Sequence, residues 1–120
     1  MGNIKSYKDL LVWQKGIEIV KEIYLLCKDL PKEEIYGLQS QMKRASISVV
    51  SNIAEGYGRN YKKSYIHFLK IARGSLLELE TQIIISNELK LISNDQFNAI
   101  NSLITEESKM LNAFIKSISN

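Results

Sequence analysis

The 120-residue chain has little of what disulfide-rich, metal-binding and β-rich proteins require. It holds one Cys and one His, which excludes a disulfide framework, a multi-cysteine metal site and a zinc cluster of Cys and His ligands. One Pro and six Gly are too few turn residues for an all-β fold. No apolar run approaches the roughly 20 residues that cross a bilayer. We therefore expect a cytoplasmic protein that contacts no membrane, holds no metal or cofactor and keeps Cys27 reduced.

The apolar residues recur at spacings of three and four, which is the helical period. Capping-box patterns begin at Ser6 and at Ser93, and Pro31 is a helix stop signal. Four amphipathic helices joined by short loops predict an all-α fold, an antiparallel up-down four-helix bundle, as one domain over residues 1–120. The helices are expected at about residues 6–29, 34–57, 61–90 and 94–118. The first six residues also fit a myristoylation pattern, which is short and matches many sequences by chance.

The spacing also predicts which side chains line the core. The first helix is expected to bury Leu10, Trp13, Ile17, Val20, Tyr24 and Cys27. The second is expected to bury Leu38, Met42, Ala45, Val49 and Asn52. The third is expected to bury Tyr65, Leu69, Ala72, Leu76, Leu79 and Ile83. The fourth is expected to bury Phe97, Ile100, Ile104, Leu111, Phe114 and Ile118.

Two helices are apolar over more of their circumference than a bundle core requires. The additional apolar residues are Ile47, Val50 and Ile53 on the second helix and Ile66, Leu77 and Ile85 on the third. A helix that is apolar on several sides is typically buried on several sides, so we expect an interface between subunits. Gly74 costs about 1 kcal/mol in a helix relative to Ala, and a close helix contact would explain that cost.

Positive charge gathers in the middle of the chain. Residues 41–75 hold seven Lys or Arg and one acidic residue, whereas the rest of the chain holds nine basic and twelve acidic residues. Aromatic residues interleave with these bases, and that combination suits phosphate contact plus base stacking. The expected phosphate contacts are Lys43, Arg44, Arg59, Lys62, Lys63 and Lys70, with Tyr57 and Tyr61 as stacking groups. The alternative interpretation is a solvated charged face with Tyr residues packed at a helix end.

Polar residues near the apolar seams are expected to form a structural network, because buried polar groups must be paired. They are Asn52, Glu55, Ser75, Glu78 and Glu80. Signals of catalysis are weak. A di-iron site requires Glu three residues before His, but the residue three before His67 is Ser64. The sequence also has no Walker pattern and no nucleophile-elbow pattern. The sequence therefore predicts a protein that is not an enzyme. A catalytic or small-molecule site that uses Glu55 and Glu78 remains an alternative.

Several segments resemble a bacterial family, the four-helix bundle proteins also called 23S rRNA-intervening sequence proteins. The resemblance extends over most of the chain and is carried by residues 11–15, 31–38, 41–45, 51–59 and 68–82. It implies a cytoplasmic up-down four-helix bundle that assembles as a ring-like homopentamer. A related protein, the accessory variability determinant of diversity-generating retroelements, binds nucleic acid and partners a reverse transcriptase.

Single residues carry this resemblance into the candidate sites. The basic positions of the family pattern are matched by Lys43, Arg44, Arg59 and Arg73. The position of Arg73 varies within the family. Its polar and small positions are matched by Asn52, Glu55, Gly56, Gly74, Ser75, Glu78 and Glu80. We predict an oligomeric bundle that binds nucleic acid, RNA rather than DNA, through a composite basic surface. The alternative is a protein-interaction scaffold, such as an accessory subunit of a reverse transcriptase.

Overall fold

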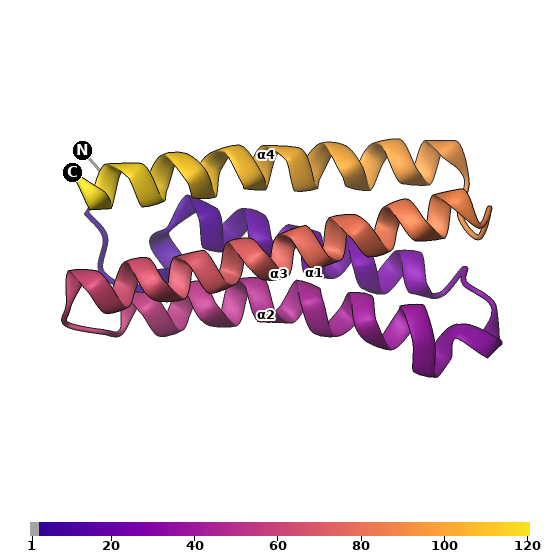
Figure 1. Ribbon diagram of the computed structural model, residues 1–120, viewed down its shortest axis with the longest axis horizontal. Coiled ribbons are helices and arrows are strands. Elements are labelled where there is room, and N and C mark those ends of the chain that lie inside the picture. Colours follow the sequence, from indigo (N-terminus) through magenta and orange to yellow (C-terminus); the bar gives the residue numbers. More distant parts are fainter. Residues whose placement is uncertain (1–2) are drawn as a thin grey trace.

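The computed structural model describes residues 3–120, and within them it contains four α-helices that pack as an antiparallel bundle (Figure 1). The helices are α1 (Leu11–Cys27), α2 (Ser40–Tyr57), α3 (Lys62–Glu88) and α4 (Asn94–Ser119). Met1 and Gly2, which the myristoylation pattern includes, lie outside the described residues. Each helix packs against its neighbours in the chain, and α1 also packs against α4, which closes the up-down bundle. The fold prediction is confirmed.

The bundle is elongated, with principal extents of 43 × 25 × 21 Å. A 27-residue helix such as α3 spans about 40 Å, so this helix accounts for the long dimension. The start of the described chain, the C-terminus and the α2–α3 turn lie at one end, on the left of Figure 1. The α1–α2 connection and the α3–α4 turn lie at the other end.

The third and fourth helices begin within one residue of the predicted positions, whereas the first two begin several residues late. The capping box of Ser6 and Asp9 is present, but it closes a short 3-10 turn over Tyr7–Asp9. The chain is then extended at Leu10, so α1 begins only at Leu11. Gly37 has non-helical dihedral angles (φ −104°, ψ −111°), and α2 therefore begins at Ser40. The capping box of Ser93 and Gln96 does begin α4 as predicted.

The predicted core positions are correct for most of α2 and α3, correct for half of α4, where Phe97, Phe114 and Ile118 are half-buried, and wrong for most of α1. Of the positions predicted for α1, only Leu10 and Cys27 are buried, while Trp13, Ile17 and Val20 are half-buried and Tyr24 is 41% exposed. The stripe that α1 buries consists of Val12, Gly16, Ile19, Ile23 and Leu26. It lies one residue away from the predicted stripe. The error arose because Gly16 interrupts the true stripe in sequence, whereas the neighbouring stripe is apolar throughout.

The α2–α3 pair is the most closely packed in the bundle. Small residues line the contact, including the buried Ala45, Ala72 and Ser75. Near the turn, a Cβ added to Gly56 would lie 2.9 Å from the Cβ of Phe68 and 3.2 Å from a backbone oxygen of α3. Glycine is therefore required where the end of α2 meets the start of α3.

Candidate nucleic-acid interface

The α2–α3 turn presents a compact group of exposed residues that we call the basic turn: Arg59, Tyr61, Lys62 and Lys63. Tyr61 is the N-cap residue of α3, and its side chain is 75% exposed. Lys62 and Lys63 are the first two residues of that helix. The chain thus brings three positive charges and one accessible aromatic ring together at one end of the bundle, which is an arrangement suited to phosphate contact and base stacking.

Arg59 is held in place by two neighbours. Its Nη2 lies 3.1 Å from Oε2 of Glu55, and its guanidinium carbon lies 4.9 Å from the ring centroid of Phe68. Both partners of the ion pair are about half exposed, so the pair contributes at most about 1 kcal/mol to stability. Phosphate can therefore compete with Glu55 for this guanidinium at little cost.

Tyr57, the second predicted stacking residue, is placed differently from Tyr61. It is half-buried, and its ring is nearly perpendicular to the ring of Tyr65, with 6.3 Å between the ring centroids. The centroid of the Tyr65 ring lies 5.8 Å from that of Phe114 in α4, so these aromatic rings join α2, α3 and α4. Burial, with a smaller contribution from Tyr57, raises the pKa of Tyr65 to about 12. Tyr57 therefore packs within the bundle, and Tyr61 is the more accessible ring.

The other predicted phosphate contacts lie away from the basic turn. Lys70 is exposed on α3, about 12 Å along the helix axis from Lys62. Lys43 and Arg44 lie about 20 Å along α2 from the turn. The Nζ of Lys43 lies 4.8 Å from the ring centroid of Tyr24 in α1. Arg44 instead lines a recess against α3, so the fold separates even these two neighbours.

Part of the predicted polar network exists, and it is centred on a residue that the sequence did not single out. The hydroxyls of Ser48 and Ser75 lie 2.8 Å apart, joining α2 to α3. Asn52 donates from Nδ2 to the Ser48 carbonyl at 2.8 Å and to its hydroxyl at 3.1 Å. Asn52 and Ser75 therefore both hydrogen-bond to Ser48.

The three predicted glutamates are not part of this network. Glu55 pairs with Arg59 at the surface. Glu78 lines the recess with Arg44. Within residues 3–120, the side chains of Glu78 and of the half-buried Glu80 form no hydrogen bond and no ion pair. The catalytic alternative requires the carboxylates of Glu55 and Glu78 to meet. Glu78 lies in the recess beside Arg44, and Arg44 is about 16 Å along α2 from Glu55, so the fold keeps the two carboxylates apart.

The solvent-facing side of α3 carries exposed apolar side chains that no helix within residues 3–120 covers. We call this surface the α3 outer face, and it consists of Ile71, Leu77, Ile84 and Ile85, which are 38–54% exposed. A Cβ added to Gly74 would meet nothing within 4 Å, so the expected close contact at this glycine is absent within residues 3–120. Ile47 is 41% exposed on α2, whereas Val50 and Ile53 belong to the bundle core and carry no argument for a subunit interface.

Together the fold and the basic turn define the class of the molecule, an antiparallel four-helix bundle with positive charge gathered at one inter-helix turn. No helix within residues 3–120 is both long enough and apolar enough to cross a membrane. In the same described range, three or more metal-ligating side chains do not gather anywhere.

The chain belongs to the 23S rRNA-intervening sequence protein family, whose model matches residues 8–113. It is similar to a solved structure from Bacteroides thetaiotaomicron VPI-5482, a protein with unknown function from the S23 ribosomal protein family. The TM-score is 0.82 and the sequence identity 28%, over 88% of this chain and 96% of the other. No curated protein matches this chain.

Proposed function

We propose that this protein is a non-enzymatic, self-associating four-helix bundle of the bacterial cytoplasm that binds nucleic acid, RNA in preference to DNA. The basic turn is the observation that carries the proposal. It places three positive side chains and an accessible Tyr61 at one end of the molecule. RNA is the nucleic acid proposed first because the exposed tyrosine suits stacking on unpaired bases; the family description names a 23S rRNA-intervening sequence and no ligand.

The basic turn of one chain offers only three positive charges to nucleic acid, and self-association would strengthen its binding. Several weak sites held in one assembly bind an extended strand far more tightly than one site does. The α3 outer face supports self-association, because it exposes apolar side chains around a glycine with open space above it. The ring-like homopentamer that the family resemblance implies would repeat the basic turn around one rim. Light scattering coupled to size exclusion tests the assembly, and a monomer at micromolar concentration would remove this part of the proposal.

Fluorescence anisotropy with a labelled mixed-sequence RNA tests nucleic-acid binding, with the DNA of the same sequence as the comparison. If each engaged chain contacts three phosphates, the logarithm of the affinity should fall with the logarithm of salt concentration with a slope of about −2 per chain. Lys62→Ala combined with Lys63→Ala should weaken binding and reduce this slope. The matched control is Lys21→Ala with Lys28→Ala, which removes the same charge from exposed positions of α1 and its end. Equal weakening by both pairs would contradict a site at the basic turn.

A protein-interaction scaffold is the second candidate function, and a specific surface favours it. A groove of about 410 Å³ lies between the N-terminal segment and the end of α4, and it is lined mainly by apolar side chains, including Ile4, Leu11, Met110 and Phe114. Leu11 is 69% exposed and Ile4 47% exposed in this groove, and contiguous exposed apolar side chains are typical of an interaction site. Co-purification of one protein at fixed stoichiometry, retained after nuclease treatment and lost on Leu11→Asp, would favour the scaffold over nucleic-acid binding.

A further inference from the structure

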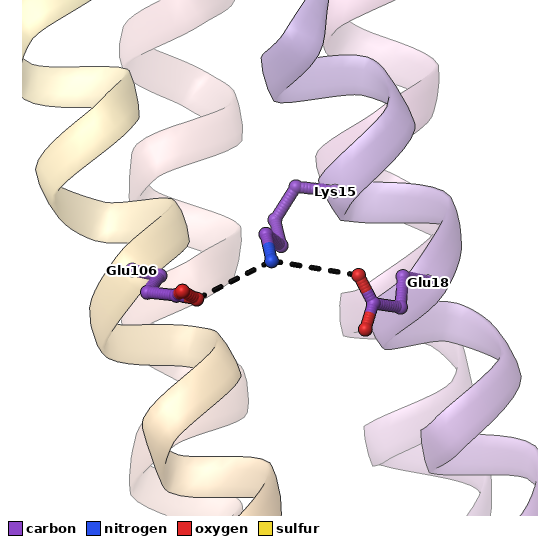
Figure 2. A network of polar contacts seen from close by, with 3 residues as sticks. All are labelled: Lys15, Glu18 and Glu106. Carbon is purple, nitrogen blue, oxygen red and sulfur yellow. Dashed lines mark hydrogen bonds and ion pairs between the residues drawn. The ribbon is translucent and has the colours of Figure 1, made fainter.

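The backbones of α1 and α4 approach each other closely over a shorter stretch than those of any other neighbouring pair of helices in the bundle. A cleft of about 180 Å³ lies at one end of this seam, between Leu25 and Ala99, and the groove at Leu11 lies at the other end. Two polar contacts join the helices across the seam. Lys15 pairs with Glu106 at 3.3 Å, as Figure 2 shows, and Gln96 donates to Asp29 at 2.9 Å. Both contacts lie at the surface, where they contribute little to stability.

A fully buried carboxyl group lies between these two ends. Glu107 of α4 is 0% exposed, and within the described residues neither of its side-chain oxygens has a hydrogen-bond partner. It faces Gly16 of α1: a Cβ added there would lie 3.1 Å from Oε2 of Glu107 and 2.5 Å from Cγ1 of Val50. Glycine at position 16 thus leaves the space that the carboxyl group and Val50 occupy.

The surroundings of Glu107 provide one charge of opposite sign, and that charge is already engaged. Lys15 of α1 lowers the pKa of Glu107, but its ammonium is held by Glu106 and by Glu18, the latter at 3.5 Å (Figure 2). Among the charged residues of α4 near this level, Glu106 and Lys109 are exposed.

The other two helices add no nearby compensating charge. At this level α2 presents Val49 and Val50, and its half-buried Lys43 lies over Tyr24 instead. The half-buried charged residues of α3 are Arg73, which donates to Asn112 at 3.1 Å, and Glu80. Burial outweighs the effect of Lys15 and raises the pKa of Glu107 to about 8. The carboxyl group is therefore neutral at pH 7.

We propose that the α1–α4 seam is a pH-sensitive seam, in which ionisation of Glu107 separates α1 from α4 while the α2–α3 pair stays packed. An ionised carboxylate without hydrogen bonds is strongly destabilised in an apolar interior. The lowest-cost relief is separation along the seam that faces it, because that seam has the shortest stretch of close approach and a cleft at each end. Once the seam opens, water and the ammonium of Lys15 stabilise the carboxylate.

Hydrogen exchange of the full chain at pH 6.5 and pH 9.5, corrected for intrinsic exchange rates, tests this seam. With a pKa of about 8 in the closed state and 4.5 in the open state, the opening equilibrium should rise about thirtyfold between these pH values. Helical amides exchange only when their own intrahelical bonds break, and the helices fray once they lose packing across the seam. Amides of α1 and α4 that exchange from this open state should lose protection by that factor, and those of α2 and α3 should not. Glu107→Gln should abolish the pH-dependent loss, whereas the control Glu88→Gln, which removes an exposed carboxylate from the end of α3, should retain it.

A second measurement on the unmodified protein does not depend on whether a variant folds. The side-chain carboxyl ¹³C resonance of Glu107 should titrate with a midpoint near 8, well above the ordinary 4.5 of a glutamate. A Glu107 midpoint near 4.5 would overturn the proposal. Equal loss of protection in all four helices, or the same loss in Glu107→Gln, would overturn it as well.

Discussion

The α2–α3 pair and the α1–α4 seam solve the same packing problem in opposite ways. Small side chains bring α2 and α3 close together, and the hydroxyls of Ser48 and Ser75 bond to each other there. Within residues 3–120, Oε1 of Gln82 on the same side of α3 has no hydrogen-bond partner, but an amide does not titrate. Across the α1–α4 seam the stretch of close approach is shorter, and the central polar group of that seam, Glu107, has no hydrogen-bond partner within residues 3–120. The comparison teaches that one bundle can bury paired hydroxyls in one seam and an unpartnered, titratable carboxyl group in another.

This difference assigns the two halves of the bundle different roles. The α2–α3 pair carries the basic turn and the α3 outer face, which the proposed function requires to be rigid. The α1–α4 half holds the buried acid and the two clefts. Variants that change one half and leave the other intact test whether the division is real.

The largest expected effect is on the pH dependence of stability. The folded-state pKa of Glu107 is about 8, above its ordinary 4.5, so the stability that its protonation confers is complete below pH 4.5. Stability should fall by about 1.4 kcal/mol per pH unit from there to pH 8 and then level off. Urea unfolding of the unmodified protein and of Glu107→Gln at pH 5, 6.5 and 8 measures this. Parallel stability profiles for the two proteins would show that Glu107 ionises normally.

The second effect concerns the space opposite Glu107. Gly16→Ala places a methyl group 2.5 Å from Cγ1 of Val50, a stiff β-branched side chain, so the helices must shift. Overpacking of this kind costs about 1–3 kcal/mol, and Ala returns only part of it through its higher helix propensity. We expect a lower midpoint in thermal unfolding by circular dichroism. Adding Val50→Ala should recover part of the loss, and no recovery would mean that another contact is responsible.

A smaller effect is expected on the α2–α3 side. Ser75→Ala removes one hydroxyl of the Ser48–Ser75 pair, while Ser48 keeps its bond from Asn52. The cost should be about 1 kcal/mol, the usual net value of one hydrogen bond. Urea unfolding at pH 6.5 measures it, with the exposed Ser102→Ala of α4 as the control. Equal stability of both variants would show that the hydroxyl pair contributes nothing to this seam.

The sequence predicted α3 and α4 better than α1 for a physical reason. Leu69, Leu76 and Leu79 repeat without interruption and meet the core as predicted. In α1 the buried stripe contains Gly16, whose lack of a side chain gives no signal of hydrophobicity. Its role appears only when α4 and α2 are placed against it.

The period left only a partial signal of Glu107. The predicted core positions of α4 include Ile104 and Leu111, and three-four spacing requires a core residue between them at 107 or 108. Glu107 and Ser108 are both polar, so the period shows that a polar residue faces the core but not which one. The basic turn was accessible from the sequence because its residues are neighbours in the chain. The distance of Lys43 and Arg44 from that turn could not be predicted in the same way, because it depends on where α2 begins and on which of its faces each side chain occupies.

The smallest expected effect on stability is the most informative about assembly. Gly74→Ala meets nothing within 4 Å and improves helix propensity, so the isolated chain should gain about 0.5–1 kcal/mol. The α3 outer face around it is apolar, and if a second copy packs there, the added methyl group occupies space that the copy needs. We expect urea unfolding at low concentration to show a more stable chain, and light scattering at high concentration to show weaker self-association. A gain in stability with unchanged assembly would place the contact between subunits on a different face from the one around Gly74.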